Sequence, residues 1–222
     1  MRNDDSLNTR LIYLHGFNSS PESQKAQNLI QFIAKEFADD QEQGRLDLHV
    51  PALPHKPARA IAMLESLIRE ETAATVLIGS SLGGFYSIYL AQDFPCKVIL
   101  INPLVTLQHD ASTDFLGKHI NPYSGETFEI VQEDAEALGQ MEVTEIKHQE
   151  NYFLLLESGD QVLDYRLALE KLPQARHKVI QGGSHRFDSF AKLLPEIMQF
   201  AGFSLDRNHA VTADEMQDKQ EH

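Results

Sequence analysis

Residues 77–85, with the sequence LIGSSLGGF, decide the fold of this chain. A short apolar run enters this stretch and a second apolar segment leaves it. Spacing selects Ser81, because Gly79 lies two residues before it and Gly83 two residues after it; Ser80 has no glycine at either offset. The resulting pattern, G-x-S-x-G, is typical of a reactive serine on a sharp turn between a strand and a helix, where small neighbours let the two elements approach closely.

A glycine-rich turn between a strand and a helix has two other uses. It can bind phosphate, but the phosphate-binding patterns G-x-G-x-x-G and G-x-x-x-x-G-K-[ST] are both absent from the sequence. It can also be a purely structural turn, and the five-residue pattern alone leaves that alternative open. The choice depends on whether the rest of the chain supplies partners for a nucleophilic serine.

Short apolar runs alternate with helical patterns along the chain. The expected strands are 10–14, 46–50, 75–78, 97–101, 152–156 and 177–180. One expected helix begins at Pro21, and four others cover 58–70, 82–92, 162–171 and 187–200. This alternation predicts an α/β fold: a doubly wound, mostly parallel sheet of about six strands with helices on both faces.

Length and composition indicate a single domain. A chain of 222 residues supports one sizeable core, and 42% hydrophobic and 23% charged residues are ordinary for a globular protein. We expect one domain over residues 1–203 and a disordered, polar and acidic tail over 204–222. Residues 103–150 are longer than one crossover helix requires, so they are either a lid at the carboxyl edge of the strands or a surface embellishment.

Charge and cysteine content limit the partners of the protein. A net charge of −14 repels phosphate backbones and anionic lipids, although a local basic patch could still bind a small anion. No stretch approaches the roughly 18 apolar residues of a membrane span, and residues 1–5 have no apolar signal core. The single cysteine, Cys96, fits a reducing compartment. We therefore expect a cytoplasmic protein that binds neither nucleic acid nor membrane; the oligomeric state stays open.

The partners that a nucleophilic serine needs follow later strands. The serine needs a base that accepts its proton, and the base needs an acid that orients it. Asp160 follows the predicted strand 152–156, and His185 lies in the glycine-rich loop after the strand 177–180. In a parallel sheet these loops emerge at the same edge as the turn at Ser81. The chain order Ser81, Asp160, His185 is that of the α/β-hydrolase catalytic triad.

Three other carboxylates compete with Asp160 for the role of the acid. Asp164 is the main rival, but about one turn into a predicted helix it would complement the helix dipole. Glu157, at the end of a strand, and Asp188, at the start of a helix, are weaker rivals. The position of Asp160 in a loop favours it.

Main-chain N–H groups near the serine are expected to stabilise an oxyanion. In proteins with this turn they come from the residue after the nucleophile and from the loop after the first strand, here Leu82 and Phe17. Gly16 would let that loop bend towards a substrate, and His15 is expected to brace the loop by hydrogen bonding.

Apolar residues near the same edge are candidates for an acyl pocket, although each fits an ordinary core role equally well. They are Leu53, Leu104, Val105 and Phe115. The sequence has no H-E-x-x-H pattern and no cluster of carboxylates and histidines, so neither a metal nor another cofactor is expected.

Several segments resemble the YqiA/YcfP-type bacterial esterases, which are small α/β-hydrolases. They are 13–21 (YLHGFNSSP), 79–84 (GSSLGG), 102–103 (NP), 121–123 (NPY), 159–165 (GDQVLDY) and 182–185 (GGSH). The resemblance extends over about residues 9–202, and its run HGFNSSP is much more specific than the serine turn alone. It implies a compact α/β-hydrolase fold and a cytosolic bacterial esterase with Ser81 as nucleophile, Asp160 as acid and His185 as base.

The sequence therefore predicts a serine esterase that hydrolyses carboxylic esters, with short acyl chains favoured, through an acyl-enzyme. The substrate would be a small-molecule ester or thioester. One alternative is an acyl-CoA thioesterase, which would need a basic patch for the phosphates of CoA. The other is a non-catalytic binding protein on a hydrolase scaffold, which has no need of three intact triad positions.

Overall fold

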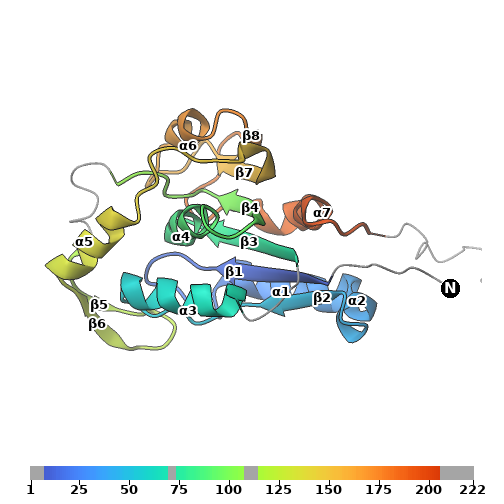
Figure 1. The fold of residues 1–222 in the computed structure, drawn as a ribbon, viewed down its shortest axis with the longest axis horizontal. Coiled ribbons are helices and arrows are strands. Elements are labelled where there is room, and N and C mark those ends of the chain that lie inside the picture. The colour runs from blue at the N-terminus through green and yellow to red at the C-terminus, as the bar shows by residue number, and fades with distance from the viewer. Residues whose placement is uncertain (1–7, 70–73, 108–114, 206–222) are drawn as a thin grey trace, which may run out of the picture.

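A six-stranded parallel sheet forms the centre of the protein (Figure 1). The computed structural model describes residues 8–69, 74–107 and 115–205. The strands are β1 (Thr9–Leu14), β2 (Leu46–His49), β3 (Ala74–Ser80), β4 (Cys96–Ile101), β7 (Tyr152–Glu157) and β8 (Arg176–Ile180), in the spatial order β2-β1-β3-β4-β7-β8. Every neighbouring pair is parallel. The predicted fold class is therefore confirmed, with strand bounds close to those expected.

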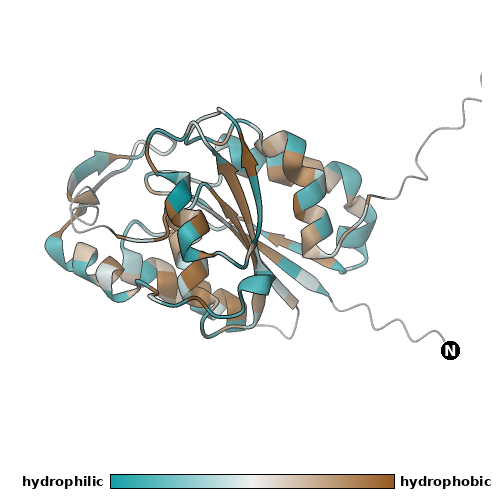
Figure 2. Ribbon diagram, turned by 90° about the horizontal axis from the view of Figure 1, so that it is seen from above, coloured by the Kyte–Doolittle hydropathy of each residue, from teal (hydrophilic) through white to brown (hydrophobic). Residues whose placement is uncertain are grey.

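Helices cover both faces of this sheet. The helices are α1 (Gln24–Glu36), α2 (Ala38–Glu42), α3 (Pro57–Arg69), α4 (Leu82–Leu90), α5 (Gln132–Gln140), α6 (Tyr165–Lys171) and α7 (Phe190–Ala201). The apolar side chains of α1 and α7 share one core cluster with one face of the strands, and those of α3, α4 and α6 pack on the other face. The central strands are buried on both faces and are mostly apolar, as the predominantly brown colouring of the central sheet shows (Figure 2).

Three helices begin later than the sequence patterns predict, because side chains bind the backbone just before each start. Helix α1 begins at Gln24 rather than at Pro21, since the hydroxyl of Ser20 accepts the N–H of Glu22 at 3.1 Å and keeps this stretch in a turn. Helix α6 begins at Tyr165 rather than at residue 162. Helix α7 begins at Phe190 rather than at residue 187.

The long segment after β4 contains structure that the sequence analysis did not predict. Strands β5 (Gly117–Ile120) and β6 (Thr127–Ile130) form an antiparallel hairpin, α5 follows it, and a 3-10 turn, η2 (Gln149–Asn151), leads into β7. Figure 1 places the hairpin and α5 beyond the carboxyl ends of the sheet strands. Residues 108–114 of the predicted lid and 206–222 of the predicted tail lie outside the described residues.

Within the described ranges, no helix is long and apolar enough to cross a membrane.

Candidate active site

Ser81 occupies a strained position on the turn between β3 and α4. Its backbone angles, φ 54° and ψ −120°, lie in a region that residues other than glycine rarely adopt. Hydrogen bonds from the neighbouring strand hold it there: the N–H of Ser81 donates to the carbonyl of Ile101 and the N–H of Leu104 donates to the carbonyl of Ser81, both at 3.1 Å. Hydrogen bonds to β4 and to the residues after it therefore hold the strained backbone of Ser81 in place.

The glycines around Ser81 are required by close approach of the backbone. A Cβ at Gly79 would lie 2.4 Å from the carbonyl oxygen of Gly83. A Cβ at Gly83 would lie 2.1 Å from the carbonyl oxygen of Leu14, at the end of β1. The two glycines of the G-x-S-x-G pattern are thus needed because the first turn of α4 packs directly against the backbone of β1 and β3.

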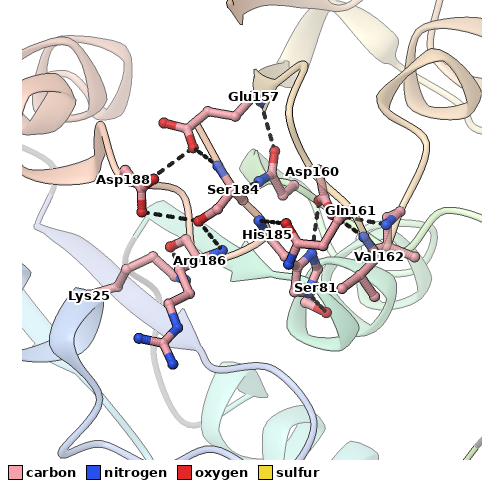
Figure 3. A network of polar contacts seen from close by, with 12 residues as sticks. Lys25, Ser81, Glu157, Asp160, Gln161, Val162, Ser184, His185, Arg186 and Asp188 are labelled. Carbon is pink, nitrogen blue, oxygen red and sulfur yellow. Dashed lines mark hydrogen bonds and ion pairs between the residues drawn. The ribbon is translucent and has the colours of Figure 1, made fainter. Parts of the chain in front are cut away.

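His185 lies between Ser81 and Asp160 and is within hydrogen-bond distance of both (Figure 3). Its Nε2 is 3.1 Å from Ser81 Oγ, and its Nδ1 is 2.8 Å from Asp160 Oδ2. The imidazole is 22% exposed, whereas the carboxylate of Asp160 is 1% exposed. The base can therefore reach a substrate while the acid is shielded from water.

The surroundings of Asp160 favour its charged form. Its Oδ1 accepts the backbone N–H groups of Val162 and Leu163 at 2.8 and 2.9 Å. Burial raises the pKa of Asp160, but the hydrogen bonds from His185 and from these two N–H groups outweigh burial and lower the pKa below its ordinary value. The group facing His185 is therefore a carboxylate at neutral pH.

The three rival carboxylates bind elsewhere. Asp164 caps α6 rather than lying inside it: its side chain accepts the backbone N–H of Arg166 at 3.0 Å and pairs with the guanidinium at 2.8 Å. Asp188, which precedes α7, accepts a hydrogen bond from the hydroxyl of Ser184 at 3.0 Å. Glu157 binds the backbone of the loop that carries His185. Of the four carboxylates, Asp160 is the one in contact with the imidazole.

The loop after β1 passes directly beside Ser81. A Cβ at Gly16 would lie 3.2 Å from the Cβ of Ser81. Within the described residues, the backbone N–H groups of Phe17 and Leu82 donate to no other group. They are the two groups that the sequence analysis predicted for an oxyanion.

His15 holds this loop to the loop after β2. Its Nε2 accepts the backbone N–H of Leu53 at 3.2 Å, and its Nδ1 lies 3.0 Å from the carbonyl oxygen of Gly16. Burial lowers the pKa of His15, which favours the neutral ring that can accept at one nitrogen and donate at the other. These contacts are those of a bracing residue.

The hairpin β5–β6 is fastened to the same loop. The ring of Phe17 makes edge contacts with Phe115 and His119, at centroid distances of 4.8 and 4.9 Å. The side-chain amide of Asn18 donates to the carbonyl of Ile120 at 3.2 Å. Sequence reasoning missed this hairpin, whose two strands are joined by a six-residue loop, 121–126, that contains proline and glycine.

The structure brings three of the four pocket candidates together. Leu53 and Leu104 are buried in one apolar cluster, and Phe115 packs against it. Leu53 also lines a cavity of about 20 Å³ beside Phe17, which has room for about one water molecule. Val105 belongs to a different cluster, which α6 and β7 share, so it stands apart from the others.

Among the residues that the structure describes, no group of three or more His, Cys, Asp or Glu side chains is arranged to hold a metal ion.

A parallel sheet with a nucleophile-type turn after β3, an acid after β7 and a histidine after β8 defines the α/β-hydrolase fold. Solved structures agree with this class. Alpha/beta hydrolase domain-containing protein 10 from mouse is 17% identical, with 87% of this chain and 89% of that chain covered and a TM-score of 0.64. The esterase domain of a Rhodothermus marinus protein is 18% identical, with 90% and 89% covered and a TM-score of 0.58. Est1E from Butyrivibrio proteoclasticus is 12% identical, with 90% of both chains covered and a TM-score of 0.58.

Within this class, the sequence matches one family over most of its length. The family described as "Uncharacterised protein family (UPF0227)" matches residues 10–202. The chain belongs to the UPF0227 family, which confirms the resemblance to the YqiA/YcfP-type proteins.

Proposed function

We propose that this protein is a serine esterase that hydrolyses small carboxylic esters through an acyl-enzyme. The observation that carries the proposal is the continuous chain of hydrogen-bond distances from Ser81 Oγ through His185 to Asp160, 3.1 and then 2.8 Å. The description of the Rhodothermus marinus structure as an esterase domain also supports this reaction class. Short acyl groups stay the expectation for the substrate.

The proposed reaction has two halves. Ser81 Oγ attacks the ester carbonyl carbon while His185 Nε2 accepts the hydroxyl proton. Asp160 holds the imidazole by Nδ1 and stabilises the imidazolium. His185 then donates the proton to the departing alkoxide, which leaves an acyl group on Ser81. Water, deprotonated by His185, attacks that acyl group and releases the carboxylic acid and the free serine.

Backbone N–H groups are suited to the negative charge that forms on the carbonyl oxygen in both halves. Phe17 follows Gly16, which lies beside Ser81 in the loop after β1, and Leu82 follows Ser81 at the start of α4. The amino end of α4 carries the positive end of its helix dipole, which adds to the stabilisation.

Covalent labelling tests the proposal directly. A fluorophosphonate reacts with a serine that is activated by a neighbouring base, and we expect peptide mapping to find the label on Ser81. Ser81→Ala and heat-denatured protein are the controls and should stay unlabelled. An intact wild-type protein that resists the reagent, or carries it on another residue, would contradict the proposal.

The same active site could cleave a thioester, and matched substrates distinguish the two activities. We expect p-nitrophenyl acetate to be hydrolysed with a higher kcat/KM than acetyl-CoA, because an acidic chain disfavours the CoA phosphates. The opposite order would identify a thioesterase.

The pH dependence of hydrolysis tests the role of His185. We expect kcat/KM to fall at mildly acidic pH, because an imidazolium cannot accept the serine proton. The pKa of Asp160 is held below its ordinary value, so this carboxylate stays charged over the same range. The profile is measured with p-nitrophenyl acetate, while circular dichroism verifies that the protein stays folded. A flat profile between about pH 5 and 8 would exclude His185 as the base.

A further inference from the structure

The loop at 181–189, which carries His185, lies outside regular secondary structure but is held closely in place. It leaves β8 through Gly182 and Gly183, whose φ values of 78° and 75° are left-handed. The chain turns sharply here, before the imidazole reaches Ser81. The position of the base therefore depends on what fixes this loop, and a buried carboxylate lies beneath it.

Glu157, the last residue of β7, binds three N–H groups of this loop, and Figure 3 shows two of them, those of Ser184 and Asp188. Its Oε2 accepts from the backbone of Ser184 at 2.8 Å and of Asp188 at 3.0 Å, and its Oε1 accepts from the backbone of Ser189 at 2.8 Å. Glu157 is fully buried, with 0% exposure. Burial raises its pKa, but these hydrogen bonds outweigh burial and lower it, so the group is a carboxylate at neutral pH.

The loop passes directly against this carboxylate. A Cβ at Gly183 would lie 2.0 Å from Glu157 Oε2, so no side chain fits at that position without moving the loop or the acid. The glycine pair next to His185 is therefore explained by the presence of Glu157 as well as by the turn.

Other groups fix the same loop from both sides. Asn102, buried after β4 with a left-handed φ of 38°, accepts the backbone N–H of Glu157 at 2.9 Å and donates to the carbonyl of Ser184 at 2.9 Å. The ammonium of Lys25, from α1, donates to the carbonyl of Arg186 at 2.8 Å. The backbone on both sides of His185 is thus bound to β4, β7 and α1.

We propose that Glu157 is a positioning residue for the reaction: its buried carboxylate sets the placement of the His185 imidazole relative to Ser81 by holding the loop backbone. This inference rests on the proposed function. Glu157 touches neither reacting atoms nor the imidazole, so it acts through Ser184, Asp188 and Ser189. Hydrogen bonds to a charged acceptor are about twice as strong as those between neutral groups, and a misplacement of about 1 Å can cost about 100-fold in rate.

Glu157→Gln tests this role with almost no change in volume. A carboxamide has one oxygen acceptor, so at least one of the three loop N–H groups must face an NH2 group. We expect kcat for p-nitrophenyl acetate to fall about 10- to 100-fold with KM within about twofold of wild type. The rate of fluorophosphonate labelling at Ser81 should fall in parallel, because it depends on the same base.

A matched control and a second variant separate positioning from stability. Glu170→Gln, on the exposed side of α6, makes the same chemical change and should leave kcat and KM unaltered. Glu157→Asp keeps the charge but withdraws the carboxylate by one methylene, so it should also lower kcat, and it serves where the glutamine variant fails to fold.

The inference is overturned if a folded Glu157 variant keeps kcat within twofold of wild type, even when its melting temperature falls. Activity and labelling of the wild-type protein are measured first. A wild type without either would reject the proposed esterase, whereas an active wild type with equally active Glu157 variants would reject only the positioning role.

Discussion

Ser81→Ala is expected to lower kcat for ester hydrolysis by about 10⁵- to 10⁶-fold, because the group that forms the acyl-enzyme is lost. Removal of one hydroxyl from an already strained turn should leave the fold unchanged. The measurement is turnover of p-nitrophenyl acetate together with a circular dichroism spectrum. A ligand would still bind, so the variant also distinguishes an enzyme from a binding protein on the same scaffold.

Ser80→Ala is the matched control, since the two serines are adjacent in the sequence. Ser80 ends β3 and is buried, with 3% exposure. We expect this variant to lose some stability and to keep kcat within a few-fold of wild type. Activity that survives in Ser81→Ala, or disappears only in Ser80→Ala, would place the nucleophile elsewhere.

Asp160→Asn is expected to lower kcat by about 10⁴-fold through a change of histidine tautomer. Two backbone N–H groups, those of Val162 and Leu163, point at Oδ1, so the asparagine oxygen would stay with them. Its NH2 group would then face His185 Nδ1 and force that nitrogen to accept. Nε2 would carry the proton and could no longer take one from Ser81.

Asp164→Asn provides the comparison for this effect. Asp164 caps α6, and asparagine is as good a cap as aspartate, so both activity and melting temperature should change little. Steady-state kinetics of the two variants under the same conditions decide between the two acids. A larger loss in Asp164→Asn than in Asp160→Asn would refute the assignment of Asp160.

The sheet and the order of the three site loops could be predicted from sequence because their signals are local. Strands such as β3 are continuous apolar runs, and Ser81, Asp160 and His185 each follow such a run. The start of α6 was misplaced because Asp160 binds the N–H groups at 162 and 163, and no periodicity records a bond between a loop carboxylate and the backbone after it.

The parts that were missed depend on contacts between distant segments. The hairpin strands β5 and β6 have only four residues each and are largely exposed, so they lack the apolar pattern of a core strand. The predicted position of Glu157 at the end of a strand is confirmed. Its contacts with Ser184, Asp188 and Ser189 require the loop after β8 to be folded back over β7.

The attachment of the hairpin to the loop after β1 has a consequence for protein engineering. Each element reaches the main chain of the other through an asparagine amide: Asn18 donates to Ile120, and Asn121 donates to Ser19 at 3.1 Å. Phe17 lies against the hairpin with its ring, and the residue before it, Gly16, lies beside Ser81. A foreign hairpin that is grafted here to widen the substrate range would therefore have to reproduce both amide contacts. Without them the loop after β1 would shift, and kcat would fall for every substrate.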